Sequence, residues 1–494
     1  MTNNFIKKNS SINEKPISKP LRAAGVFTLL SFLPSLLNVF LLPLYFNYLD
    51  ASQFGILALL NIFGGIYSII ANLQLNSSVS VLYFNYSGDS VLKHNYVSVT
   101  FSSSLWISIA MLFLFSLTGN LWFRYIIGLE IDFYPMGLMV LITSFSNQII
   151  STFLKFSKNE YRLKEYFFYS IALIALSTSF QVFFIVIMKW DLFGSLLGSL
   201  IGNLMVAIIL LIVNRSLITL KIDWRVLNES LRFSLPLIPF IALNWLMTVV
   251  DKIVLGRYCD TSVVGQYSVL ISLLLFANQI FIALWNAFTP KILLSLADNS
   301  DNLSLSKIFV RWHIFLGVII LSGTVLVGSN LNLITSNEKY LATIHLFSIG
   351  VLAMLPKLLK SISTLQLMYI KKTRALAINN LLTFVTLISG LIILVPLLNM
   401  LGAILALAIS NSLGFGILYY QSEKKYDIRL KLCRSDVFFL ASSILLVAIT
   451  YWITKELNFT LQLYGLIQFI VLLVFVFFRY GTFMRNTFYK IIRW

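Results

Sequence analysis

Charged side chains are scarce in this chain, and so are the residues that enzymes most often use for catalysis. Charged residues make up 11% of the 494 positions, whereas soluble domains average about 25%. There are three histidines and two cysteines, and the sequence has no phosphate-binding G-x-x-x-x-G-K-[ST] loop and no Ser-His-Asp arrangement. These absences argue against a soluble enzyme, a metal-binding protein and a nucleotide-driven pump.

Long apolar runs take the place of these residues. Hydrophobic residues make up 58% of the chain, and fourteen runs of about 18 to 25 residues extend from Ala23 to Tyr480. At about 1.5 Å of rise per helical residue, each run can cross a hydrocarbon core of about 30 Å. We therefore predict an all-α integral membrane protein with 14 transmembrane helices. The seventh, eleventh and twelfth runs are Leu235–Leu255, Leu376–Leu398 and Leu401–Tyr420.

Positive charge is distributed unevenly between alternate connections. The net charge is +18. On the side of the two termini we count 29 of the 37 Lys and Arg residues and on the other side 6, while Lys357 and Lys360 fall within a run. This bias predicts a multi-pass protein of the cytoplasmic (inner) membrane with both termini in the cytoplasm. It also explains the net charge by attraction to anionic lipids, so we do not expect a nucleic-acid partner.

An internal repeat divides the chain. Tyr48–Gly55 and Tyr258–Gly265 match at four of eight positions with an offset of 210 residues, and Gly194–Leu197 resembles Gly402–Leu405 at an offset of 208. Both matches predict two six-helix lobes in a parallel repeat around a central cavity. Helices 13 and 14 have no counterpart and form a C-terminal hairpin.

The predicted organisation is an N-terminal cytoplasmic tail, an N-lobe with helices 1–6, a cytoplasmic linker, a C-lobe with helices 7–12, a cytoplasmic loop, and the last hairpin with a cytoplasmic tail. The bounds of these parts are 1–22, 23–213, 214–234, 235–420, 421–436 and 437–494.

Several short segments, in this order and spacing, are similar to one known family. They are Leu235–Pro239, Asp251–Tyr258, Val264–Ser268, Pro290–Lys291, Val395–Pro396 and Leu401–Ala406. Through them the chain resembles the polysaccharide biosynthesis and export proteins of the multidrug, oligosaccharidyl-lipid and polysaccharide flippase superfamily.

This resemblance implies a flippase for an O-antigen or capsule repeat unit linked to undecaprenyl pyrophosphate, which works without nucleotide hydrolysis. It implies no cofactor, with a proton or sodium gradient as the energy source. The implied partners are the lipid-linked oligosaccharide, membrane lipids, a polysaccharide polymerase and a chain-length regulator. Helices 13 and 14 would either border a groove for the isoprenoid tail or only pack against the bundle.

Two lysines within the tenth run are candidates for an anion site. A charge near the membrane centre costs about 2.5 to 3.5 kcal/mol on insertion scales, so its presence suggests a function. Lys357 lies near the midplane, and Lys360 follows at i+3 on the same helix face. We predict that both face the cavity and bind the pyrophosphate. The alternative is a structural ion pair with an acid on another helix.

Four further residues complete the predicted site. Asp251 is the acid that lies clearly within a run, so we predict that it couples transport to an ion; a structural contact with a neighbouring cation is the alternative. Arg257 and Arg311 would guide phosphates at the two mouths of the cavity or anchor the helix ends. Trp245 would stack on a sugar or face lipid.

Three rival functions differ in what they require. A multidrug or cation antiporter of the same superfamily would have a smaller, acidic or aromatic cavity. A membrane-embedded polysaccharide polymerase or ligase would need a large outward loop, whereas the longest one predicted here has about 16 residues. A scaffold in a glycan assembly complex would tolerate substitutions in the cavity.

Overall fold

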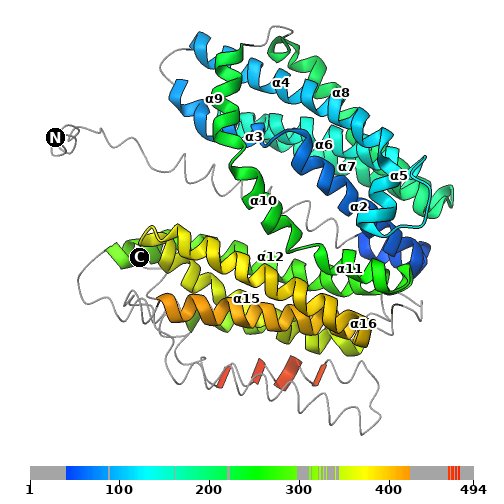
Figure 1. The fold of residues 1–494 in the computed structure, drawn as a ribbon, viewed down its shortest axis with the longest axis vertical. Coiled ribbons are helices and arrows are strands. Elements are labelled where there is room, and N and C mark those ends of the chain that lie inside the picture. The colour runs from blue at the N-terminus through cyan, green and yellow to red at the C-terminus, as the bar shows by residue number, and fades with distance from the viewer. Residues whose placement is uncertain are drawn as a thin grey trace.

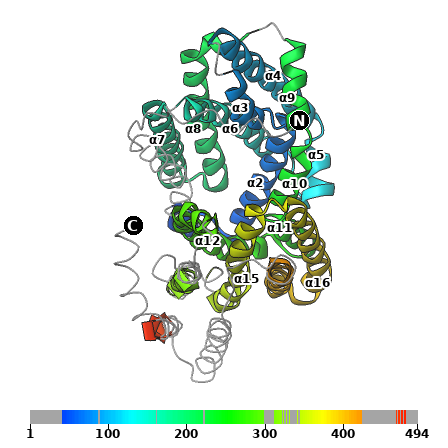
Figure 2. The same ribbon diagram turned by 90° about the vertical axis from the view of Figure 1, so that its left-hand side faces the viewer.

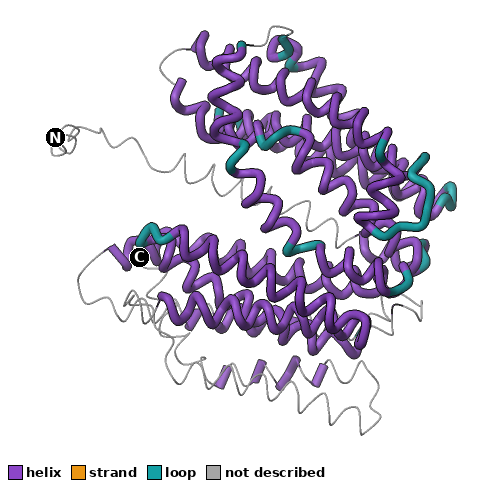
Figure 3. Tube along the Cα trace, viewed as in Figure 1, coloured by secondary structure: helices purple, strands orange, loops and turns teal. Residues whose placement is uncertain are grey.

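The computed structural model describes residues 41–86, 90–160, 162–219, 223–297 and 344–422, with short pieces between 311 and 340 and between 466 and 478. Helices make up almost all of these ranges, which contain no strand (Figure 3). The N-terminal tail, most of helix 1, all of helix 13, much of helices 9 and 14, and the C-terminal tail of the predicted scheme lie outside the described residues.

The first group of helices forms the upper body in Figure 1, and we call it the N-terminal group. Its main helices are α2 (Ala51–Ala71), α3 (Leu75–Leu82), α4 (Ser90–Leu117), α6 (Met136–Asn159), α7 (Leu163–Val182), α8 (Asp191–Val213) and α9 (Trp224–Ser234). Its short helical segments are η1 (Tyr83–Tyr86), α5 (Gly119–Leu121), η2 (Trp122–Ile127), η3 (Phe183–Ile187) and η4 (Arg215–Leu217).

The second group forms the lower body in Figure 1, and we call it the C-terminal group. It contains α11 (Val250–Tyr258), α12 (Thr261–Ala297), α15 (Ile344–Tyr369) and α16 (Thr373–Tyr420). The helix α10 (Leu237–Leu246) passes from one group to the other. The two groups are also distinct in the view turned by 90° (Figure 2), and α2 packs against α12 where they meet.

The length and composition of the helices identify a membrane protein. Eight described helices are long and apolar enough to cross a membrane, and the α9–α10 pair, bent by 45°, makes a ninth candidate. The 48 residues of α16 contain a break at Asn399, where the backbone leaves helical geometry. The two halves of α16 pack against each other: a Cβ added to Gly390 would lie 3.1 Å from Ala406 Cβ, and one added to Gly414 would lie 2.6 Å from Thr383 Oγ1. The break lies between the predicted eleventh and twelfth runs, and the total of 14 spans stays a prediction.

The seventh predicted run is not one continuous helix. Residues 247–249 form a turn that separates α10 from α11, and α10 has no buried residue. By contrast, α11 buries Val250, Asp251 and Leu255. The break therefore allows the two halves of this segment to present different faces to their surroundings.

Apolar side chains form both the interior and the outer surface, as expected when lipid is the solvent. Phe63 lies at the centre of an aromatic cluster, with ring centroids 5.1 Å from Phe123, 5.8 Å from Phe133 and 6.0 Å from Phe115. On the outside of α16, Leu397 is 73% exposed. Such an exposed apolar surface would be unfavourable in water but suits a hydrocarbon environment.

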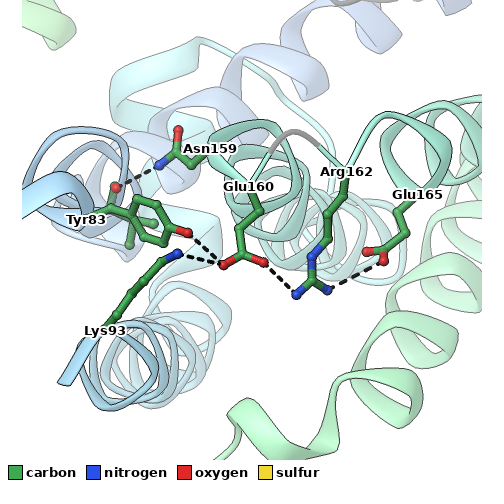
Figure 4. A network of polar contacts seen from close by, with 7 residues as sticks. Tyr83, Lys93, Asn159, Glu160, Arg162 and Glu165 are labelled. Carbon is green, nitrogen blue, oxygen red and sulfur yellow. Dashed lines mark hydrogen bonds and ion pairs between the residues drawn. The ribbon is translucent and has the colours of Figure 1, made fainter. Parts of the chain in front are cut away.

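A polar network joins four elements of the N-terminal group (Figure 4). One oxygen of Glu160 accepts hydrogen bonds from Tyr83 Oη at 2.7 Å and Lys93 Nζ at 3.1 Å, and the other oxygen pairs with Arg162. Arg162 also lies 3.5 Å from Glu165. Burial raises the pKa of Glu160, but the hydrogen bonds and the charge of Arg162 outweigh it, so the pKa is lowered. The network therefore holds an ionised carboxylate.

The linker helix α9 is attached to this group by side-chain hydrogen bonds. Tyr86 donates to Glu229, while the Ser230 hydroxyl lies 3.4 Å from both Tyr96 Oη and Thr100 Oγ1. Ser230 is fully buried. These contacts fix α9 to the N-terminal group up to the bend that precedes α10.

Candidate substrate cavity

A cavity of about 620 Å³ lies between the two groups of helices. Residues of α2, α6, α7 and α8 line it on one side, and residues of α10, α11 and α12 on the other. Amide and hydroxyl side chains dominate its polar surface. They are Tyr45, Asn61, Ser68, Thr143, Ser144, Asn147, Gln181, Ser195, Ser199, Ser268, Ser272 and Gln279.

The cavity carries little formal charge. Among the described residues that line it, Lys252 is the one charged side chain, and none is Asp or Glu. Amides and hydroxyls both donate and accept hydrogen bonds, so they match the hydroxyl groups of a sugar. A surface of this composition suits a polar, neutral or anionic molecule better than an organic cation.

The broken segment α10–α11 supplies two residues to the cavity wall. Trp245 lies on α10, and Lys252 is the third residue of α11. The indole of Trp245 lies so close to Gly65 of α2 that a Cβ added there would be 2.4 Å from Cζ2. Only a residue without a side chain leaves room for the ring at this position. Trp245 thus connects the segment to the N-terminal group.

On the N-terminal side, hydrogen bonds fix the polar lining. Tyr45 Oη donates to Gln181 Oε1, and Asn203 Nδ2 donates to Ser177 Oγ at 3.2 Å and to the Ser199 carbonyl at 2.7 Å. Tyr45 and Gln181 of the wall thus hold each other in position, while Asn203 and Ser177 lie behind the wall and join α8 to α7.

Asp251 points away from the cavity and is only 3% exposed. Its Oδ2 accepts a hydrogen bond from Tyr267 Oη at 2.6 Å, and its Oδ1 accepts one from the Lys252 backbone at 2.8 Å. Lys357 on α15 interacts electrostatically with the same carboxylate. The C-terminal group therefore surrounds Asp251 with a phenol and two cations.

The predicted lysine pair lies within the C-terminal group, and neither lysine lines the cavity. Lys360 Nζ donates to Asn380 Oδ1 at 3.1 Å. It also donates to the Asn379 amide at 3.1 Å, once that amide is oriented so that its nitrogen donates to the Gly414 carbonyl. Asn380 in turn donates to Asn244 of α10 at 3.4 Å. Lys360 is thus part of an amide cluster between α15, α16 and α10.

The predicted arginines lie apart from the cavity. Arg257 is exposed and lines a second hollow of about 1450 Å³, at the end of the molecule where α2 and α12 begin. Arg124, Glu130, Asp132 and Asp260 line the same hollow. Arg311 is half-buried and lines neither space. Trp245 is therefore the one predicted site residue that lines the cavity between the groups.

Four residues of the cavity wall were not predicted from the sequence. They are Lys252 and the amides Asn61, Asn147 and Gln181. Lys252 lies within the seventh predicted run beside Asp251, but the sequence does not show which side of this run meets the cavity. Asn61, Asn147 and Gln181 lie in strongly apolar runs. A polar side chain in such a run is an available signal, since it needs a partner or a water-filled space.

No known protein-family model and no curated protein sequence matches the chain. Its fold resembles that of the lipid II flippase MurJ in an inward closed conformation, with a TM-score of 0.66 and 15% identity over 93% of this chain and 99% of that chain. It also resembles an inward-facing multidrug resistance MATE family transporter of the MOP superfamily, with a TM-score of 0.65 and 11% identity over 82% and 98% of the two chains.

A third similar structure is a mutant of the Vibrio cholerae MATE transporter VcmN, with a TM-score of 0.51 and 13% identity over 83% of this chain and 96% of that chain. All three proteins are transporters or flippases, not enzymes. At these identities the similarity concerns the fold alone. The chain thus shares the fold of these three transport proteins, and its substrate must be inferred from its own residues.

Proposed function

We propose that this protein is a flippase that moves a lipid-linked oligosaccharide from the cytoplasmic to the outer leaflet of the inner membrane. The observation that supports this most directly is the composition of the cavity wall, where amides and hydroxyls combine with one lysine and, among the described residues, no carboxylate. Sugar hydroxyls need paired donors and acceptors, and a linking phosphate needs a cation. The carrier lipid proposed is undecaprenyl pyrophosphate, and the glycan an O-antigen or capsule repeat unit.

Alternating access between the two groups is the proposed mechanism. Where α2 and α12 begin, the two helices are in close contact, whereas the cavity lies further along them, near Ser68 and Ser268. With both termini in the cytoplasm, this contact closes the outer side. Separation at this contact and closure on the opposite side would move the cavity contents across the membrane.

Ion coupling through Asp251 is part of the proposal. The carboxylate is buried beside Tyr267 and two lysines, so a change in its protonation changes the balance of charge inside the C-terminal group. A proton is the proposed coupling ion, because Tyr267 and the Lys252 backbone already donate to this carboxylate and no cluster of acidic oxygens for a metal cation occurs in the described residues.

The main alternative is a multidrug antiporter, because the same fold serves a MATE transporter. The composition of the cavity favours the glycan. A cationic drug would bind beside Lys252 without a compensating carboxylate in the described wall, and like charges repel strongly at low dielectric.

The proposed function can be tested by expressing the protein in a bacterial strain that lacks its own repeat-unit flippase. Expression of this protein should restore the surface glycan and reduce the lipid-linked intermediate that accumulates on the cytoplasmic leaflet. Several strains with different repeat units are needed, since the sugar sequence is not specified by the proposal. If the protein increased drug resistance and restored no glycan, the antiporter would be supported instead.

A further inference from the structure

We infer that the broken segment α10–α11 binds both ends of the sugar–phosphate linkage: Lys252 binds the phosphate and Trp245 stacks on the first sugar. This inference rests on the proposed function and specifies how the head group lies in the cavity. The predicted anion site at Lys357 and Lys360 is a different location, so the two proposals can be separated by experiment.

Lys252 has the position required of a phosphate ligand. It is the one charged residue among the described residues of the cavity wall. Asp251 does not neutralise it completely, because its carboxylate is oriented toward Tyr267 and also interacts with Lys357. An anion in the cavity therefore meets an attractive charge at Lys252.

Trp245 provides the apolar surface that a sugar ring needs. The C–H groups of a pyranose face pack on an aromatic ring, and the ring position is fixed where Gly65 receives the indole. The same cavity includes Lys252. A sugar on Trp245 and its linking phosphate at Lys252 would thus occupy one continuous site on a single chain segment.

This arrangement orients the head group, with its sugars on one side of the cavity and its lipid on the other. Asn61 of α2, Asn147 of α6 and Gln181 of α7 line the opposite side of the cavity. The remaining sugars would extend from Trp245 toward these amides, which can pair with their hydroxyls. The lipid would leave the site from the phosphate, on the side of Lys252.

The first experiment measures binding of farnesyl pyrophosphate to the detergent-solubilised full-length protein. In Lys252→Gln the dissociation constant should rise about tenfold or more, because a charge-assisted contact is lost. Lys252→Arg should restore binding, and Lys164→Gln, which removes an exposed lysine of α7, should have no effect. Unchanged binding in Lys252→Gln, or equal binding of farnesol to the wild type, would overturn the phosphate assignment.

The second experiment adds one sugar to the probe. Farnesyl pyrophosphoryl N-acetylglucosamine should bind the wild type more tightly than farnesyl pyrophosphate does. Trp245→Ala should abolish this gain, whereas Trp245→Phe should retain most of it. An undiminished gain in Trp245→Ala would overturn the stacking assignment. Thermal unfolding and gel filtration of each variant check that it is folded.

The assignment of the phosphate site and the proposed function can be refuted separately. If the wild type restores a surface glycan but Lys252→Gln binds the pyrophosphate normally, the site assignment is wrong and the proposed function stands. If Lys252 is required for binding but no glycan is restored in any strain, the site binds a lipid pyrophosphate and the proposed function is wrong.

Discussion

Gly55 on α2 and Gly265 on α12 each pack against the backbone of the opposite helix. A Cβ added to Gly55 would lie 1.9 Å from the Thr261 carbonyl oxygen, and a Cβ added to Gly265 would lie 1.9 Å from the Ala51 carbonyl oxygen. Next to them, Ser52 Oγ and Thr261 Oγ1 are 2.6 Å apart. The contact is reciprocal and depends on the absence of side chains, as in closely packed membrane helices.

This contact explains the strongest internal repeat in the sequence. Gly55 matches Gly265 and Ala51 matches Thr261 at the offset of 210 residues. The two copies of the repeated segment thus meet each other, and equivalent residues exchange equivalent contacts, as they do across a two-fold axis. Close packing at this contact leaves no room for a side chain at Gly55 or at Gly265.

Gly55→Ala should separate the helices at this contact. The added methyl group cannot be accommodated by a side-chain movement, because the atoms that it meets belong to the backbone. The measurement is disulfide formation between Ser52→Cys and Thr261→Cys in a Cys259→Ser background. Cross-linking should be efficient in this background and several-fold slower with Gly55→Ala. Gly416→Ala, at a glycine with no neighbour within 4 Å, should cross-link normally. Equal rates in all three would contradict the role of the contact.

Glu160→Gln should destabilise the N-terminal group at neutral pH by about 1 to 3 kcal/mol, because it weakens hydrogen bonds to a charged acceptor. The pKa of Glu160 is lowered in the folded protein. Its contribution is therefore present above the ordinary pKa of 4.5 and is lost as the pH falls through the lower folded value.

Thermal unfolding in detergent measures this difference across pH. The difference in unfolding temperature between the wild type and Glu160→Gln should be largest at pH 7 and should decrease below pH 4.5. Glu165→Gln is the matched control, since Glu165 is more exposed and lies 3.5 Å from Arg162. A gap that does not change with pH would show that the charge of Glu160 is unimportant.

Replacing Lys357 and Lys360 together with Gln separates the anion site predicted from the sequence from the phosphate site at Lys252. If Lys357 and Lys360 bind the pyrophosphate, the double variant should lose glycan display with the protein still present in the membrane at near-normal abundance. If Lys252 binds the phosphate, the double variant should bind farnesyl pyrophosphate as the wild type does. Immunoblots of membranes, together with surface glycan staining, distinguish the loss of display from misfolding. Loss of folded protein in Lys357→Gln alone would instead favour a structural pairing with Asp251, with which Lys357 interacts.

Asp251→Asn should uncouple transport from a proton gradient while leaving the binding of farnesyl pyrophosphate intact. An amide at this position keeps an acceptor for Tyr267 but cannot exchange a proton. Translocation of a lipid-linked oligosaccharide in vesicles is measured with and without an imposed gradient. Gradient dependence that is unchanged in the variant would remove Asp251 from the coupling mechanism, and a wild type indifferent to the gradient would exclude proton coupling.

The orientation of the chain is tested with reporter fusions. Fusions at Lys424 and Trp494 should report a cytoplasmic location, and fusions at Asp50 and Lys339 an external one, because of the distribution of Lys and Arg. An external signal at Trp494 would contradict the arrangement of 14 spans with both termini inside.

Apolar runs predicted the helices well because a span is specified by length and hydrophobicity alone. The predicted break between Leu398 and Leu401 contains Asn399, where the structure bends. The turn at 247–249 had no such signal, since Met247, Thr248 and Val249 include neither glycine nor proline. That turn places Lys252 in the cavity wall. The residues that line the cavity therefore could not be predicted from the sequence.

The most direct test of the central claim is transport by the purified protein in sealed vesicles that contain a fluorescent undecaprenyl-pyrophosphate-linked oligosaccharide. The wild type should carry the glycan across the bilayer, where it becomes accessible to a glycan-cleaving enzyme on the opposite side. Lys252→Gln should do so much more slowly, and a cationic dye should not be transported. Transport of the dye without any translocation of the glycan would contradict the account.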